Sequence, residues 1–359
     1  MHILVTGGAG FIGSTLVDTL LMRGHSVDII DNLSTGSFQN LHDAERHGSS
    51  FHFEEIDVCD PAIDVFIKRR RPEVVFHLAA QASVAASLDD PVHDAEINIL
   101  GSLRVLQATS THGVRKIVFA ASGGTLYGDP PRSALPINET LPHAPTSPYG
   151  ISKMIILSYL RTYQMVRGLD FTALALANVY GPRQDPHGEA GVVAIFASNL
   201  ARARRSMIFG DGEQTRDFVY VDDVADAFVR AIEFGSGRVL NIGTGVQTSV
   251  NTLYRMLAQA VGSNDEAIHV PPRTGEVLAS ALDPSEAHVA IGWQPSISVA
   301  EGAIRVLAAQ SASTNGPWDT IDCTAPNVIT GANSPGIVPS NSARPLIRNK
   351  EGSDKRYSF

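Results

Sequence analysis

Cysteine is scarce in this sequence: its two cysteines, Cys59 and Cys323, lie far apart in a chain of 359 residues. They build no disulfide framework, and no Cys/His cluster has the spacing of a metal site. Uninterrupted apolar runs long enough to cross a bilayer are also missing, and the first predicted strand begins at His2, which leaves no room for a signal peptide. We therefore expect a cytoplasmic protein without a metal cofactor.

Basic residues are also fewer than acidic ones. Lys and Arg number 28 against 37 Asp and Glu, so the formal net charge is −9. This balance disfavours nucleic acid or an anionic membrane as the main partner. What the chain does have is the composition of an ordinary globular protein, with 43% hydrophobic and 18% charged residues, and its length suggests about two domains.

A glycine-rich turn follows the first apolar run, at Gly7, Gly10 and Gly13, and a helical apolar period comes after it. In such a turn Gly7 permits the tight bend, Gly10 lets the backbone approach a pyrophosphate, and Gly13 lets the helix pack closely on the strand. Glycines alone also suit a plain strand-to-helix turn. Because the second apolar run ends in Asp31, an acid placed to bind the ribose hydroxyls of NAD, we predict a dinucleotide site.

Apolar runs alternate with helical patterns over the first half of the chain, which is typical of an α/β fold with a doubly wound parallel (Rossmann) sheet. The predicted strands lie near residues 2–6, 26–30, 51–57, 73–79, 115–121 and 170–176. We expect the NAD-binding domain to span 1–177, with 217–245 returning to it as strand (217–221) and helix (222–234). A smaller substrate-binding lobe at 178–309 and a C-terminal tail of low order at 310–359 should follow.

Residues near the predicted strand ends can contribute to the same site. Asp57 and Val58 end the third strand, where the carboxylate could reach an adenine amino group or could simply close a turn. Three small or apolar residues after the fourth strand leave room for a nicotinamide ribose: Leu78, Ala79 and Ala80. His77 inside that strand is better explained as a hydrogen-bonded core residue than as a catalyst. Asn98 belongs to a predicted helix at 97–107 that we expect mainly to pack.

A second informative stretch runs from Ser147 to Lys153. Ser147 suits the cap of a helix and Pro148 its first turn. Tyr149 and Lys153 are four residues apart and would share one helix face, so the ammonium can lie near the phenol. Lowering a phenol pKa from about 10 to about 7 takes roughly 4 kcal/mol, so Lys153, the helix end and a cationic nicotinamide would have to act together. Tyr149 is then a candidate general base.

Several motifs carry a family resemblance over about residues 1–309. They lie at residues 6–13, 31–36, 77–80, 149–153, 178–184, 216–218 and 272–276. With these motifs the sequence resembles an extended short-chain dehydrogenase/reductase of the nucleotide-sugar epimerase/dehydratase type, most similar to the UDP-glucose 4-epimerases.

The resemblance implies a nucleotide-sugar 4-epimerase that keeps NAD bound through its cycle. In this family the tyrosine, here Tyr149, removes the proton of the sugar 4-hydroxyl while hydride passes from C4 to the nicotinamide. The 4-keto sugar then turns over and takes hydride on its other face. The resemblance also implies cofactor contacts from further residues: Phe11, Ile12, Asn32, Asn98, Tyr149 and Lys153.

On the substrate side, Asn178, Arg216 and Arg273 match family positions that hold the nucleotide diphosphate. Ser280 matches a position that gates the 2-substituent of the sugar, where a small side chain leaves room for an N-acetyl group; an ordinary loop serine explains it equally well. Further implied substrate contacts are Val192, Phe209 and Glu276. The helices around 95–108 and 149–167 pair two subunits in the resembling family, so a homodimer is expected.

One departure from the family pattern is Gly123, where a Ser or Thr usually stands four positions before the tyrosine of a Tyr-Gly pair, here Tyr127. Ser122 or Thr125 is left to supply that hydroxyl.

The alternatives to epimerisation differ in how well the sequence fits them. The related 4,6-dehydratases need an Asp-Glu pair where this chain has Gly124 and Thr125, which argues against that reaction. Decarboxylation of a nucleotide-sugar acid stays open, because it needs much the same oxidation step. A catalytically silent NAD-binding sensor or scaffold is the alternative of another class, and the intact Tyr149 and Lys153 disfavour it.

Overall fold

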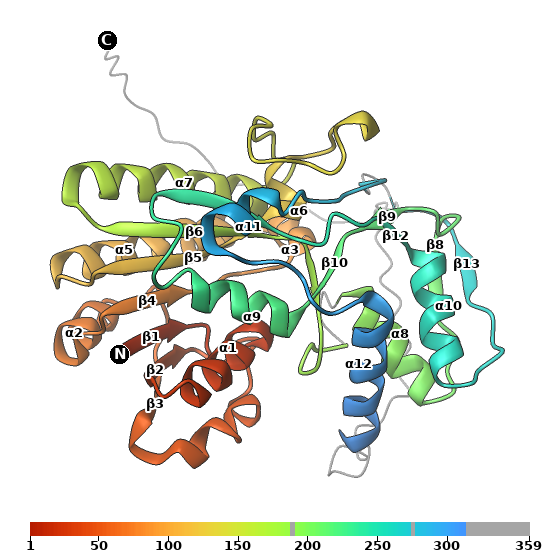
Figure 1. Ribbon diagram of the computed structural model, residues 1–359, viewed down its shortest axis with the longest axis horizontal. Coiled ribbons are helices and arrows are strands. Elements are labelled where there is room, and N and C mark those ends of the chain that lie inside the picture. The colour runs from red at the N-terminus through yellow and green to blue at the C-terminus, as the bar shows by residue number, and fades with distance from the viewer. Residues whose placement is uncertain (187–190, 274–276, 314–359) are drawn as a thin grey trace, which may run out of the picture. The chain divides into compact units, whose positions relative to one another are not determined.

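A seven-stranded parallel sheet forms the centre of the computed structural model, which describes residues 1–186, 191–273 and 277–313, except the side chains of 311–313 (Figure 1). In spatial order its strands are β11 (Arg238–Ile242), β6 (Asp170–Leu176), β5 (Lys116–Ser122), β4 (Val74–His77), β1 (His2–Thr6), β2 (Ser26–Asp31) and β3 (Phe51–Glu55). Every neighbouring pair is parallel. The strand order reverses beside β1, so the predicted doubly wound α/β fold is confirmed.

Helices cover this sheet on both faces (Figure 1). The helical segments of this part are α1 (Phe11–Met22), η1 (Phe38–Leu41), η2 (Ala44–Ser50), α2 (Ala62–Arg70), α3 (Val84–Asp89), α4 (Pro91–Ala95), η3 (Glu96–Gly101), α5 (Ser102–Thr111), α6 (Gly123–Leu126), η4 (Arg132–Ala134), α7 (Pro148–Arg167), α9 (Val221–Arg230) and α11 (Ser285–Ile291). Helices α1 and α9 pack on the face that carries Val5 and Phe76. Helices α2, α5 and α7 pack on the face that carries Leu4 and Val75. Because both faces are buried, the strands read as unbroken apolar runs.

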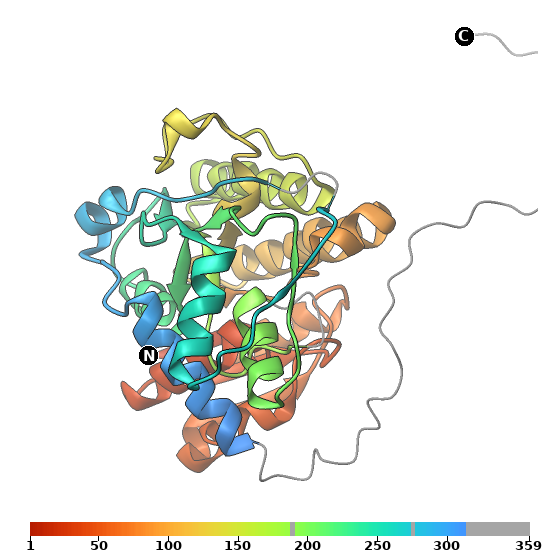
Figure 2. The ribbon, with the colours of Figure 1, turned by 90° about the vertical axis from the view of Figure 1, so that its right-hand side faces the viewer.

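A second core lies beside the sheet, where three helices pack against one another (Figure 2). Its elements are β7 (Asn178–Tyr180), α8 (Val192–Ala201), β8 (Met207–Phe209), β9 (Thr215–Arg216), β10 (Phe218–Tyr220), β12 (Thr248–Ser249), α10 (Val250–Ala260), β13 (Ile268–Val270) and α12 (Val299–Ser313). The short strands pair as β7 with β10, β9 with β12, and β8 with β13. From this region the chain returns to the sheet through α9 and β11.

Several predicted boundaries were wrong. Strand β3 ends at Glu55 and β4 at His77, so Asp57 and Leu78 lie in the turns beyond them. The predicted strand 217–221 is shorter, because only Phe218–Tyr220 form β10 and Asp217 separates this strand from β9. The Asp217 carboxylate accepts from two other segments, at Thr244 and Gly245 and at Leu282. The predicted helix 97–107 is divided into a π-helical turn, η3, and the regular helix α5. The predicted helix 222–234 ends at Arg230.

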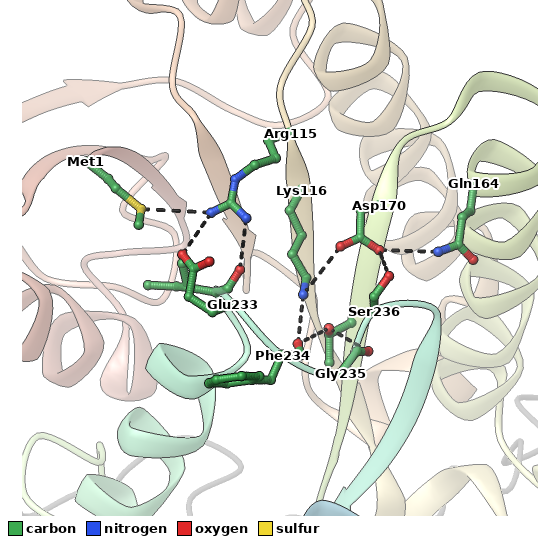
Figure 3. Close-up of polar contacts among 11 residues, drawn as sticks. Met1, Arg115, Lys116, Gln164, Asp170, Glu233, Phe234, Gly235 and Ser236 are labelled. Atoms are coloured by element: carbon green, nitrogen blue, oxygen red, sulfur yellow. Dashed lines mark hydrogen bonds and ion pairs between the residues drawn. The ribbon is translucent and has the colours of Figure 1, made fainter. Parts of the chain in front are cut away.

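A polar network fastens the amino-terminal edge of the sheet (Figure 3). The Lys116 ammonium at the start of β5 is 1% exposed, donates to the Phe234 carbonyl at 2.7 Å and lies 3.5 Å from the Asp170 carboxylate. Asp170 begins β6 and also accepts from Gln164 and Ser236. The network therefore ties β5 and β6 to the turn that follows α9. The residues predicted to be functional lie at the opposite, carboxyl edge.

Among the helices in the described part of the chain, none combines the length and apolar character needed to cross a membrane. Within the same residues, no group of three His, Cys, Asp or Glu side chains is arranged to hold a metal ion.

Candidate active site

The glycine turn between β1 and α1 is packed so closely that two of its glycines tolerate no side chain. Gly7 has φ +70°, and a Cβ there would lie 2.6 Å from the Ala79 nitrogen. A Cβ at Gly13 would lie 2.1 Å from the Gly7 carbonyl oxygen. At Gly10, by contrast, the nearest described atom would be the Gly7 oxygen at 3.3 Å, so this side of the turn has room for a ligand. The geometry fits the three predicted roles.

Helix α1 begins directly at this turn, with Gly10 as its N-cap and no side chain capping it. Its first backbone N–H groups lack intrahelical partners and carry partial positive charge, which suits a pyrophosphate. Phe11 and Ile12 in the first turn pack partly buried against the second core. They position the helix start between the two cores of the molecule.

Asp31 at the end of β2 is 8% exposed and holds the surrounding backbone. Its Oδ2 accepts from the Ala9 N–H at 3.0 Å and its Oδ1 from the Leu33 N–H at 2.8 Å. Burial raises the pKa of this carboxyl, and the two hydrogen bonds oppose the rise. Asp31 therefore also shapes the glycine turn, a role that its sequence position did not suggest.

Asn32 and Asp57 meet at the neighbouring strand end. The Asn32 amide donates to Asp57 Oδ2 at 2.8 Å, and Asp57 Oδ1 accepts from the Cys59 N–H at 2.7 Å. Burial favours protonation of Asp57, but these hydrogen bonds outweigh it and lower the pKa. The Cys59 bond is an Asx turn, so the turn alternative for Asp57 has a geometric basis. Val58 beside it is buried in the core under α2 and α5.

A buried series of side-chain hydrogen bonds lies at the end of β4 and supports the segment that follows this strand. Thr6 Oγ1 lies 2.7 Å from His77 Nδ1, and His77 Nε2 lies 2.9 Å from Ser102 Oγ. Burial, with the charge of Lys153, lowers the pKa of His77 to about 3, so this ring stays neutral. The interpretation of His77 as a hydrogen-bonded core residue is confirmed.

Asn98 positions the same segment from the side. Its amide accepts from the Gln81 N–H at 3.0 Å and donates to the Gln81 carbonyl at 2.9 Å. Leu78 and Ala79 are fixed by Thr6, whose carbonyl and hydroxyl accept from their N–H groups. Together with Ala80, which is half-buried, they form the loop that faces Gly7. Asn98 lies in the π-helical turn η3, and such turns are frequent at functional sites.

Helix α7 carries the predicted catalytic pair. Ser147 caps it by accepting from the Gly150 N–H at 3.2 Å, and Pro148 lies in the first turn, as predicted. Lys153 is 4% exposed; its Nζ donates to the Ala120 carbonyl at 3.1 Å and lies 5.7 Å from the centre of the Tyr149 ring. Tyr149 and Lys153 thus share one helix face against the end of β5.

Burial shifts both groups of this pair toward their neutral forms. It raises the pKa of Tyr149 to about 12; the neighbouring Ser122 side chain lowers this pKa, and the charge of Asp94 raises it further. It lowers the pKa of Lys153 to about 8, which the charge of Asp94 partly counters. The lowering of the tyrosine pKa expected from Lys153 and the helix end is therefore not achieved by the chain alone, because desolvation outweighs it.

The hydroxyl that replaces the one missing at Gly123 is best placed on Ser122. The Ser122 side chain is close enough to Tyr149 to act on its phenol and lower the pKa, whereas Thr125 Oγ1 donates at 3.4 Å to the Ser122 carbonyl. A Cβ at Gly123 would lie 2.3 Å from Leu282 Cδ1, so a serine at that position would require the Leu282 side chain to shift. Around Gly124 a Cβ would meet no described atom within 4 Å.

The predicted substrate residues gather in two groups. Arg216 follows Thr215, whose carbonyl accepts from the Ser280 N–H at 3.2 Å, and the Asn178 N–H donates to the Asp217 carbonyl at 2.9 Å. In the other group the Arg273 guanidinium lies 4.0 Å from the centre of the Phe209 ring. Val192 begins α8 and is half-buried. Glu276 lies outside the described residues.

Asp217 is a buried residue that the sequence did not single out as functional. Its carboxylate accepts from the Thr244 and Gly245 N–H groups and from the Leu282 N–H, at 2.8 to 3.0 Å. Burial raises its pKa, and these bonds oppose the rise. Because Asp217 follows Arg216 directly, it fixes the backbone that carries this arginine. Only its place in a three-residue family motif pointed to it.

Known proteins are similar to this chain in sequence and in fold. The UDP-glucose 4-epimerase of Mycolicibacterium smegmatis is 50% identical over 308 residues, 86% of this chain and 97% of that protein. The structure of Thermotoga maritima UDP-glucose 4-epimerase with UDP-glucose superposes with a TM-score of 0.84 at 45% identity, covering 88% of this chain and all of that one.

The Thermus thermophilus UDP-glucose 4-epimerase in complex with NAD gives a TM-score of 0.81 at 40% identity, covering 87% of this chain and all of that one. The model of the NAD-dependent epimerase/dehydratase family matches residues 3–243. Most of the chain is therefore accounted for by one family of NAD-dependent enzymes. This protein belongs to the NAD-dependent epimerase/dehydratase family.

Proposed function

We propose that this protein is a nucleotide-sugar 4-epimerase that interconverts UDP-glucose and UDP-galactose. The observation that carries the proposal is the placement of Tyr149, whose ring centre lies 5.7 Å from the Lys153 ammonium on one helix face and whose phenol has the Ser122 side chain as a neighbour. The names of the similar proteins support the choice of substrate. In this proposal residues 1–177 and 217–245 bind the cofactor, and 178–309 form the substrate lobe.

The residues of the glycine turn fit NAD. Gly10 leaves space beside the uncapped start of α1, and Asp31 offers carboxylate oxygens at the end of the adjacent strand. When bound, NAD supplies a hydride acceptor and a positive charge. Asp31 would disfavour a 2′-phosphate by like-charge repulsion, so NAD is the form that suits this site.

Tyr149 is the proton acceptor in this proposal. It takes the proton of the sugar 4-hydroxyl and returns it at the end of the cycle, while Ser122 holds the phenol oxygen. Lys153, with a pKa of about 8, is mostly charged at neutral pH and favours the phenolate. Arg216, Asn178 and Arg273 are the proposed contacts of the UDP diphosphate, since guanidinium forks match phosphate oxygens.

A homodimer is part of the proposal. Several large apolar side chains are exposed on α3, α4, η3 and α7, the elements beside the catalytic helix: Leu88, Val92, Leu100, Ile151 and Tyr159. A second copy would cover them. Sedimentation of the purified protein at the mass of a single chain would contradict this assignment.

The function is tested by incubating the purified protein with UDP-galactose, UDP-glucose or UDP-glucuronate and separating the products. We expect UDP-galactose and UDP-glucose to reach the same equilibrium mixture from either side without added NAD. Release of carbon dioxide from UDP-glucuronate, without exchange of the two hexoses, would show a decarboxylase instead.

Substitutions around the phenol test the assigned roles. Tyr149→Phe should lower kcat by at least about a hundredfold with NAD still bound, because a phenyl ring packs alike but accepts no proton. Ser122→Ala should lower kcat by about tenfold or more, and Thr125→Ala by clearly less. Equal losses in the two single variants would place the missing hydroxyl on neither residue alone.

Substrate breadth depends on Ser280 in this proposal. A hydrogen bond from the Ser280 N–H to the Thr215 carbonyl places Ser280 next to the strand of Arg216. Because the serine side chain is small, it leaves room for an N-acetyl group, and the wild type should also turn over UDP-N-acetylglucosamine. Ser280→Tyr should lower kcat/KM for the acetylated sugar by about tenfold or more and leave the plain sugar less affected, through steric overlap. An unchanged ratio of the two kcat/KM values would make Ser280 an ordinary loop residue.

The glycine turn gives a matched pair of variants. Gly13→Ala places a methyl group 2.1 Å from a backbone oxygen and should lower the melting temperature. In Gly10→Ala the methyl group lies 3.3 Å from the Gly7 oxygen, a tight contact but a much smaller overlap than at Gly13, so this variant should lose less melting temperature than Gly13→Ala yet bind NAD at least about tenfold more weakly. Thermal melting of the variants measures the first effect, and calorimetric titration of the cofactor-free proteins with NAD measures the second. Wild-type NAD affinity in Gly10→Ala would exclude the close approach of a pyrophosphate there.

A further inference from the structure

Asp94, in α4, is a buried carboxylate with no role so far. The residue is fully buried, at 0% exposure. Its Oδ2 accepts from the Ser152 hydroxyl at 2.6 Å. Its Oδ1 accepts from the Asn98 amide at 2.8 Å and from the Gln81 amide at 3.1 Å. Both oxygens are therefore used, by side chains from three different parts of the chain.

Those three parts are the ones that build the catalytic side of the site. Ser152 precedes Lys153 on α7, the helix that also carries Tyr149. Asn98 lies in η3 and binds the backbone of Gln81 in both directions. Gln81 ends the segment that passes Gly7 after β4. Asp94 thus joins the catalytic helix to the loop beside the glycine turn.

We propose that Asp94 is a positioning residue of the active site, which fixes α7 against the loop after β4 and whose negative charge acts on the catalytic pair. A carboxylate buried this completely is costly unless its hydrogen bonds and a nearby cation offset the loss of water. Here the three hydrogen bonds and the buried Lys153 ammonium provide that compensation. The inference rests on the proposed epimerase function.

The charges around Asp94 make its effect specific. From α7 the groups that feel its charge are Tyr149 and Lys153, and it raises the pKa of both, opposing burial at the lysine and adding to burial at the tyrosine. The other charged or titratable groups on α4 and its neighbours α3 and η3 are exposed to solvent: Asp89, Asp90, His93 and Glu96. Solvent screens these groups, whereas the buried Lys153 and the half-buried Tyr149 are screened less.

Two variants of the full-length NAD-bound enzyme separate the charge from the hydrogen bonds. In Asp94→Asn the amide oxygen can still accept from Asn98 and Gln81, and its NH2 group can donate to Ser152, so mainly the charge is lost. In Ser152→Ala the charge stays and one connection between α4 and α7 is lost. The measurements are kcat and KM over a pH series, with the UDP-galactose assay.

We expect the pH profile of kcat in Asp94→Asn to move to lower pH by about one unit, because removing a negative charge lowers the pKa of both Tyr149 and Lys153. Ser152→Ala should lower kcat by about threefold to tenfold, with KM for the sugar and the position of the profile unchanged. A purely structural role would lower stability in both variants and move neither profile. An Asp94→Asn profile that superposes on wild type overturns the electrostatic part of the proposal.

Two further measurements apply if Asp94→Asn does not fold or if the wild type shows no turnover. If Asp94→Asn does not fold, Ser152→Ala and Gln81→Leu decide the positioning part, and an unchanged kcat in both overturns it. The phenolate absorbance of Tyr149, taken as the difference from Tyr149→Phe, gives its titration without any turnover. An inactive wild type with a shifted Tyr149 titration in Asp94→Asn would therefore reject the epimerase assignment and support the effect of the Asp94 charge.

Discussion

Contact of backbone with backbone at Gly7 and Gly13 sets the geometry on which the rest of the site depends. The strand end, the start of α1 and Ala79 approach one another so closely that a methyl group at either glycine would overlap main-chain atoms. This packing fixes the start of α1 at the carboxyl edge of the sheet. Thr6 extends it, because the Thr6 hydroxyl contacts both the Ala79 N–H and His77. The phosphate-facing and nicotinamide-facing sides of the proposed site are therefore built from one rigid unit.

Local sequence sufficed for the features that depend on near neighbours. The strands follow from apolar runs, the start of α7 from Ser147 and Pro148, and the hydrogen-bonded core role of His77 from its place inside an apolar strand. The strand ends were less predictable, since Asp57 and Asp217 bend the chain through bonds that compete with the ladder. Periodicity alone does not reveal such competition.

The residues that sequence reasoning missed act across long separations. Asp94 binds Ser152, 58 residues away, and Asp217 binds Leu282, 65 residues away. Nothing near either aspartate in the sequence marks it as buried. The choice between Ser122 and Thr125 was open for the same reason, because it depends on which hydroxyl lies beside Tyr149 in α7. Contacts between residues so far apart in the sequence are known only once the fold is known.

Desolvation raises the pKa of Tyr149, whereas base catalysis near neutral pH needs this pKa to be lowered. A phenol whose pKa is about 12 lies some 5 units above neutral pH, which corresponds to roughly 7 kcal/mol. Neither Ser122 nor Lys153 closes that gap in the protein alone, because the same desolvation that strengthens their interactions also penalises the phenolate. The remaining stabilisation has to arrive with the charge of the bound cofactor and the hydroxyl of the substrate. A site built in this way keeps its base protonated, and hence unreactive, until both are in place.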